Sequence, residues 1–234
     1  DAWPGVCAQF GLEYQPQLAA ALRGSNGAKS VEIIHRFYPE ADGAAMIAAC
    51  YNQVQDRLLQ GVPKKKGLDE LLAYLKGRGL PMAIGSSTKS PLVKRNLKMA
   101  GVEGYFSQIA AGEMVTLCKP APELFSLAAK LLGLPPQNCL VLEDSFNGVR
   151  AGRAAGCVTV MVPDLSAPTQ EILALCDGCC EDLEQVIGWM EQRERTETRG
   201  VLKPRIFAGC ASIPAMQSRR KPKTAPLPGR GYEL

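Results

Sequence analysis

The sequence has no long apolar run, and it contains a single histidine among its 234 residues. None of its apolar segments approaches the ~20 residues that a membrane-spanning helix needs. Its first residues, Asp-Ala-Trp-Pro-Gly, show no basic segment followed by an apolar stretch, as a signal peptide would. We therefore expect a cytoplasmic protein that does not contact a membrane.

Aromatic residues make up only 6% of the chain, while hydrophobic residues reach 46% and charged residues 21%. These values are ordinary for a folded soluble protein. The net charge of +4 is unevenly distributed, because residues 193–234 contain ten Lys or Arg and only three acids. This stretch is rich in proline and has no apolar period, so we expect a disordered basic tail. No aromatic residue interleaves with its basic cluster at 219–223, which argues against a nucleic-acid partner, and a nucleic-acid tether stays the weaker alternative.

The nine cysteines are odd in number and lie mostly in apolar segments, where reduced cysteine acts as a small hydrophobic residue. Cys176, Cys179 and Cys180 have a spacing that also occurs in metal sites. A structural zinc site needs four ligands, however, and the only histidine, His35, is far away in sequence and lies in a helical pattern. Reduced, non-ligating cysteines are therefore expected.

Short apolar runs alternate with amphipathic stretches between residues 81 and 164. The runs at 82–85, 108–111, 139–142 and 158–162 are continuous rather than alternating, which favours parallel strands covered by helices on both faces. This pattern predicts an α/β fold with a Rossmann-like parallel sheet. Residues 1–60 have helical patterns and form a predicted helical module, residues 61–192 the core, and residues 193–234 the tail. The lysines at 64–66 most simply form a solvated hinge, although one of them could face an anion.

Polar residues follow three of the predicted strands, at the edge where a parallel α/β sheet binds its ligands. Ser86 and Ser87 precede a helix and offer hydroxyl groups and backbone N–H groups to a phosphate, although such residues also cap helices. Lys119 stands before a proline-rich helix start and could neutralise a phosphate oxygen. Glu143 and Asp144 leave an apolar strand together, where magnesium would relieve their repulsion. Capping by Asp144 or Ser145 is the alternative.

At these residues the sequence resembles the haloacid dehalogenase superfamily. Ser86-Ser87, Lys119-Pro120-Ala121-Pro122-Glu123-Leu124-Phe125 and the segment from Leu142 to Val149 (Leu-Glu-Asp-Ser-Phe-Asn-Gly-Val) are similar to the second, third and fourth motifs of that superfamily. The greatest similarity is to the branch of β-phosphoglucomutase-like enzymes and sugar-phosphate phosphatases. It runs from about residue 2 to 191, and residues 11–14 and 22–25 resemble the helical cap of that branch.

The resemblance implies a magnesium-dependent phosphatase that acts on a small phosphorylated metabolite, as a monomer. Ser86 would hydrogen-bond the phosphoryl group together with the N–H group of Ser87. Lys119 would hold the same group and the carboxylate of the nucleophile. Asp144, supported by Glu143, would bind Mg²⁺. In the family the nucleophile is the first Asp of an Asp-x-Asp motif, which forms an aspartyl-phosphate that water cleaves, and the second Asp is the general acid and base.

No Asp-x-Asp motif follows a predicted strand in this sequence. Asp42 has no buried strand before it, and Asp164 corresponds to a later loop of the family, so neither is the expected nucleophile. We expect instead an N-terminally truncated core that lacks its first, central strand and is nearly inactive as it stands. Its sheet should then be interrupted between the strands that end near Ser86 and Glu143.

Two alternatives remain open at this point. A phosphomutase of the same branch would carry an arginine in the cap soon after Leu22-Arg23-Gly24, and residues 25–29 contain none, which favours the phosphatase. A non-catalytic protein that keeps the phosphate pocket is the second alternative. The residues do not indicate which phosphate ester is the substrate.

Overall fold

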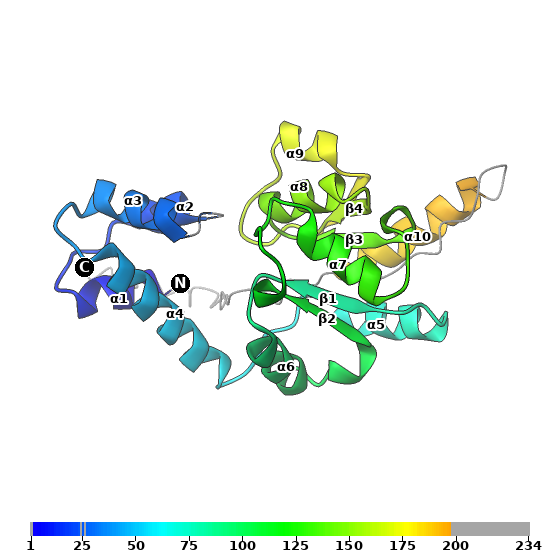
Figure 1. The fold of residues 1–234 in the computed structure, drawn as a ribbon, viewed down its shortest axis with the longest axis horizontal. Helices are drawn as coiled ribbons and strands as arrows, with labels where there is room; N and C mark the ends of the chain where they lie inside the picture. Colours follow the sequence, from blue (N-terminus) through cyan, green and yellow to red (C-terminus); the bar gives the residue numbers. More distant parts are fainter. Residues whose placement is uncertain (1, 24, 26, 198–234) are drawn as a thin grey trace, which may run out of the picture.

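The computed structural model describes residues 2–23, 25 and 27–197, and the fold is shown in Figure 1. Most of the predicted basic tail lies outside the described residues. Residues 193–197 differ from the prediction, because they continue the last helix, α10 (Leu183–Glu197). Among the described residues, no helix is long and apolar enough to cross a bilayer.

Four helices form the N-terminal part: α1 (Trp3–Gln9), α2 (Pro16–Leu22), α3 (Gly27–Phe37) and α4 (Gly43–Leu58). Proline stands in the first turn of α1 and of α2, where its missing N–H group costs no hydrogen bond. Asp42 caps α4 by accepting a hydrogen bond from the N–H of Ala45 at 2.9 Å. The four helices gather at one end of the molecule (Figure 1). They bury a cluster of their own, which contains Val6, Cys7, Leu18, Ile34, Tyr38 and Met46.

The strands of the remaining part are all parallel, which confirms the predicted fold class. β1 (Ala83–Ser86) pairs with β2 (Gln108–Ala111), with Ala83 opposite Gln108. β3 (Leu140–Glu143) pairs with β4 (Val158–Met161), and β4 pairs with β5 (Gly178–Cys179). The cysteine cluster at 176–180 is therefore largely an edge strand and its flanks. Within the described part of the chain, no group of three or more potential metal-ligating side chains occurs.

Helices cover the strands on both faces, as the continuous apolar runs predicted. They are α5 (Leu68–Gly77), α6 (Ser90–Met99), α7 (Glu123–Leu131), α8 (Phe146–Ala154), α9 (Gln170–Leu175) and α10, with 3₁₀ turns at Glu103–Tyr105, Gly112–Met114 and Pro136–Asn138. Successive residues of β3 show the reason for the pattern. Leu140 and Leu142 join a cluster with residues of α5, α6 and α10, whereas Val141 joins one with residues of α7 and α8. Both faces of a strand are buried when helices lie on both sides.

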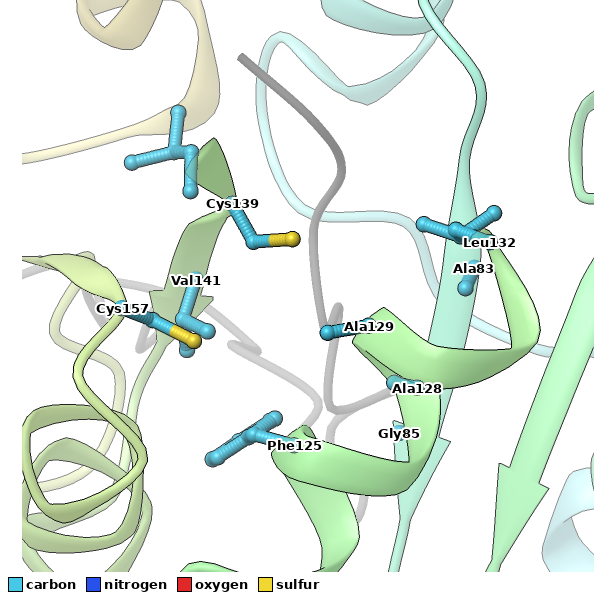
Figure 2. A pocket seen from close by; sticks show the side chains of 10 residues that line it. Ala83, Gly85, Phe125, Ala128, Ala129, Leu132, Cys139, Val141 and Cys157 are labelled. Carbon is cyan, nitrogen blue, oxygen red and sulfur yellow. The ribbon is translucent and has the colours of Figure 1, made fainter. Parts of the chain in front are cut away.

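The described strands form two separate sheets rather than one, and the division lies between β1 and β3. Figure 2 shows the pocket between them, with Ala83 and Gly85 of β1 on one side and Cys139 and Val141 near β3 on the other. Helix α7 (Glu123–Leu131) also lines this pocket, through Phe125 and Ala129. The two strands run in the same direction across it (Figure 2), so their carboxyl ends, Ser86 and Glu143, point toward the same end of the core. An interruption at this place is what the sequence predicted.

Candidate active site

A buried ion pair between Lys119 and Glu143 is the central feature of the site. The Lys119 Nζ atom contacts Oε1 of Glu143. The Glu143 side chain is fully buried and that of Lys119 is 9% exposed. The charges of such a pair are removed from water, and each lowers the cost of burying the other. The two residues, 24 positions apart in sequence, thus form one unit at the end of β3.

The other oxygen of Glu143 is held by the start of α8. Its Oε2 accepts hydrogen bonds from the hydroxyl of Ser145 at 2.9 Å and from the backbone N–H of Ser145 at 3.3 Å. The Ser145 hydroxyl oxygen also accepts from the N–H of Gly148 at 3.0 Å and caps the helix. Gly148 packs against the Glu143 carboxylate so closely that a Cβ atom there would collide with it. The Glu-Asp-Ser-Phe-Asn-Gly segment therefore fixes the Glu143 side chain by local geometry.

Lys119 is positioned by the loop and helix around it. Its Nζ lies 4.8 Å from the centre of the Phe125 ring, within the range of a cation–π contact. Glu123, in the first turn of α7, accepts hydrogen bonds at Oε2 from the N–H groups of Thr116 and Leu117, at 2.8 and 3.0 Å. These bonds tie the loop before Lys119 to the helix after it.

Asp144 lies beside the buried pair and faces a lysine of the hinge segment. Lys65 Nζ is 3.6 Å from Oδ2 of Asp144, and both side chains are 16% exposed. Burial raises the pKa of the Asp144 carboxyl above its ordinary value. Lys65 opposes this shift, and the negative charges of Glu143 and Asp164 add to it. The sequence favoured a solvated hinge for residues 64–66 and left open that one of the lysines faces an anion. For Lys65 the second interpretation holds, because it faces the Asp144 carboxylate.

Ser86 and Ser87 lie at the carboxyl end of β1, in the other sheet. The hydroxyl of Ser86 accepts a hydrogen bond from the N–H of Thr88 at 3.1 Å. The N–H of Ser90, at the start of α6, donates to Oε1 of Glu113 at 2.8 Å. The sequence suggested free N–H groups at this helix start, but these two already have acceptors. The structure thus brings Lys119, Glu143, Asp144 and Lys65 into one group. Ser86 and Ser87 lie at the end of a strand in the other sheet, and their place in the same site stays a prediction.

Two side-chain hydrogen bonds join the N-terminal helices to the core. Arg23, which follows α2, donates from Nη1 to the carbonyl oxygen of Leu165 at 3.3 Å. Arg95 of α6 donates from Nη2 to Oε1 of Gln55 in α4 at 2.6 Å. Leu165 directly follows Asp164, whose charge acts on Asp144. The segment after β4 therefore connects the helical part to the acidic side of the site.

Of the two carboxylates expected to bind Mg²⁺, Asp144 fits that role, whereas Glu143 is already bound by other groups. Both oxygens of Glu143 are engaged, by Lys119 and by Ser145. Asp144 is partly exposed and lies near other acids, and Lys65 stands 3.6 Å from its Oδ2 atom, beyond hydrogen-bond distance. Magnesium commonly uses one or two carboxylates and completes its shell with water and substrate phosphate. Asp144 thus fits as a ligand, and Glu143 serves to hold Lys119.

Replacing Asp144 with Asn should stabilise the metal-free protein at neutral pH. A carboxyl whose pKa is raised on folding contributes stability below its unfolded pKa, here about 3.8, and loses it as the pH rises through the higher folded value. At pH 7 the ionised carboxylate is therefore a net cost, which the neutral amide avoids. We expect D144N to raise the free energy of unfolding at pH 7, with a smaller gain at pH 4. Thermal melts in EDTA at both pH values measure this, and a lower Tm for D144N at pH 7 would contradict it.

Comparison with protein families gives a match to the haloacid dehalogenase-like hydrolases over residues 13–156. The chain belongs to this family. The match includes Ser86, Lys119, Glu143 and Asp144, the residues that the resemblance had singled out. Family membership makes the protein a hydrolase.

Curated relatives of the chain are named as phosphatases. The chain is 33% identical to fructose-1-phosphate phosphatase YqaB of Escherichia coli over 162 residues, which is 69% of this chain and 85% of the relative. It is 32% identical to hexitol phosphatase A of the same organism over 161 residues, 69% of this chain and 73% of the relative. These similarities agree with the sugar-phosphate phosphatase branch.

Among solved structures, the fold is similar to that of a putative β-phosphoglucomutase from Thermotoga maritima, with a TM-score of 0.67 and 20% identity. The match covers 82% of this chain and 89% of that one. At this level of identity the likeness concerns the fold alone, and it confirms the predicted Rossmann-like α/β class.

Proposed function

We propose that the protein is built to hydrolyse small phosphate monoesters, such as sugar phosphates, with Mg²⁺ and through an aspartyl-phosphate. The observation that carries this proposal is the buried Lys119–Glu143 pair beside Asp144. A fixed ammonium next to an available carboxylate provides one group for a phosphate oxygen and one for a divalent cation. Relatives named as phosphatases support the same class of substrate.

The chain's own residues have distinct roles in this proposal. Lys119, oriented by Glu143 and Phe125, binds the phosphoryl group and offsets its charge. The Ser86 hydroxyl and the Ser87 N–H bind further phosphoryl oxygens from the end of β1. Magnesium at Asp144 would offset charge on the phosphate and on the attacking carboxylate.

The nucleophile is proposed to lie on a further strand between β1 and β3. An Asp carboxylate there would attack phosphorus as the ester oxygen leaves and takes a proton from the second Asp of the pair. Water would then cleave the aspartyl-phosphate and release inorganic phosphate. Of the alternatives in the chain, Asp42 is used as a helix cap. The helical cap formed by residues 1–60, the cytoplasmic location and the monomeric state stay predictions.

The proposal is tested by a phosphate-release screen. Sugar phosphates, hexitol phosphates and nucleotides would be offered to the chain extended by an Asp-x-Asp strand, with magnesium or with EDTA. We expect release from one or more sugar or hexitol phosphates, at least tenfold lower in EDTA, and loss of most activity in S86A. Activity that is equal in EDTA would overturn the magnesium requirement, and absence of any release would favour the non-catalytic phosphate-binding alternative.

A further inference from the structure

Three consecutive lysines in the segment between α4 and α5 each meet an acid, but in different surroundings. Lys64 Nζ lies 2.8 Å from Oδ1 of Asp69, whose side chain is 61% exposed. Lys66 Nζ lies 2.7 Å from Oδ2 of Asp182, and the Lys66 side chain is 73% exposed. Ion pairs of such exposed side chains contribute little to stability, because water and salt screen them.

Lys65 differs from its two neighbours in burial and in the acid that it meets. Its side chain is only 16% exposed, and its Nζ donates to the carbonyl oxygen of Val162 at 3.0 Å. The second contact of Nζ, at 3.6 Å, is to Oδ2 of Asp144. Val162 directly follows β4, so Lys65 is anchored at the carboxyl end of the sheet. The ammonium group is thus held beside the carboxylate that is available for a cation.

We propose that Lys65 is a built-in counter-ion that competes with Mg²⁺ for Asp144 and so weakens magnesium binding. The inference rests on the proposed function, because it takes Asp144 as the magnesium ligand. Asp144 is close to the negative charges of Glu143 and Asp164, and Glu143 is already neutralised by Lys119. In the metal-free protein, the positive charge of Lys65 partly offsets the negative charge of Asp144.

Lys65 and Mg²⁺ would compete because both are cations that contact the same carboxylate, that of Asp144. A divalent cation bound to Asp144 would stand close to a monovalent cation 3.6 Å from the same carboxylate, and like charges at short range repel. Either Lys65 withdraws toward Val162 or the metal binds less tightly. In the first case part of the metal's binding free energy is used to displace the lysine, and in the second the repulsion between the two cations lowers it. Removing the ammonium while keeping a side chain of similar length should therefore tighten magnesium binding.

The experiment measures magnesium affinity of the full chain by isothermal titration calorimetry and by the rise of Tm with magnesium, at low ionic strength and pH 7.5. Four proteins are compared: the natural sequence, K65M, K64M and D144N. We expect K65M to bind Mg²⁺ at least about fivefold more tightly than the natural sequence, the lower end of typical coupling between ligands. K64M removes a neighbouring charge outside the site and should bind as the natural sequence does. D144N should show no saturable magnesium binding.

The outcomes separate the inference from the proposed function. Equal or weaker binding by K65M, while D144N loses binding, overturns the role of Lys65 and leaves Asp144 as the metal ligand. Binding by D144N equal to that of the natural sequence overturns the metal site itself. If K65M does not give a cooperative melt, K65Q replaces it, and K65R, which keeps the charge, should restore the affinity of the natural sequence. A K65R protein that binds magnesium as tightly as K65M or K65Q would contradict competition by charge.

Discussion

Replacing Lys119 with Met is expected to lower the free energy of unfolding by about 3–5 kcal/mol, because it leaves the fully buried carboxylate of Glu143 without its cation. That loss is a large part of a typical total stability of about 5–15 kcal/mol. Methionine retains most of the apolar stem of lysine, so a void is not the main cause. Urea unfolding followed by circular dichroism measures the change directly.

A double variant distinguishes charge from packing in this prediction. K119M/E143Q removes both charges and leaves a neutral amide that still accepts hydrogen bonds from Ser145. It should recover much of the loss, since the penalty arises from one uncompensated buried charge. The exposed pair at Lys64 gives the matched control, and K64M should change stability by less than about 1 kcal/mol. A K119M protein within about 1 kcal/mol of the natural sequence would show that Lys119 and Glu143 are not a compensating pair.

The sequence predicted the strands well because each is a continuous apolar run closed by polar residues. The runs at 108–111 and 139–142 differ from β2 and β3 by no more than one residue at either end. Such runs depend on burial of both faces, which is a local signal. The sequence does not predict the edge strand β5, because it has only two residues, Gly178 and Cys179. The cysteines of this segment have a spacing that also occurs in metal sites, which hides the strand.

The sequence predicts which residues belong to the site, but it does not predict which of them form ion pairs with one another. Lys119 and Glu143 were assigned separately, to the phosphate and to support of the metal, and the contact between them depends on how β3 and the loop before α7 lie in space. Lys65 was grouped with its neighbours because three consecutive lysines resemble a solvated segment. Its burial comes from the positions of Asp144 and Val162, 79 and 97 residues later in the chain. Contacts over such separations leave no periodic trace in the sequence.

Extending the chain at its N-terminus with an apolar strand that ends in Asp-x-Asp is expected to raise magnesium-dependent phosphatase activity at least roughly a thousandfold over the chain as printed. Hydrolysis of phosphate monoesters is among the slowest uncatalysed reactions, so supply of a nucleophile has a large effect. We expect the added strand to pair with both β1 and β3, which run in the same direction and belong to separate sheets (Figure 2). A parallel strand of about five residues inserted there would bring its carboxyl end to the level of Ser86 and Glu143. Phosphate release from the best ester of the screen measures the gain.

An extension ending in Asn-x-Asn separates the structural contribution of the strand from its chemistry. It should raise the Tm as much as the Asp-x-Asp extension in the absence of magnesium, because both join the two sheets, yet it should give no gain in activity. Combining the Asp-x-Asp extension with K119M should lose the activity, since the phosphoryl group and the new carboxylate would lack their shared cation. If the chain as printed hydrolyses the same ester as fast as the extended one, the nucleophile lies among its own residues. Asp164, beside Asp144, would then be the first to replace with Asn, because Asp42 is used as the cap of α4.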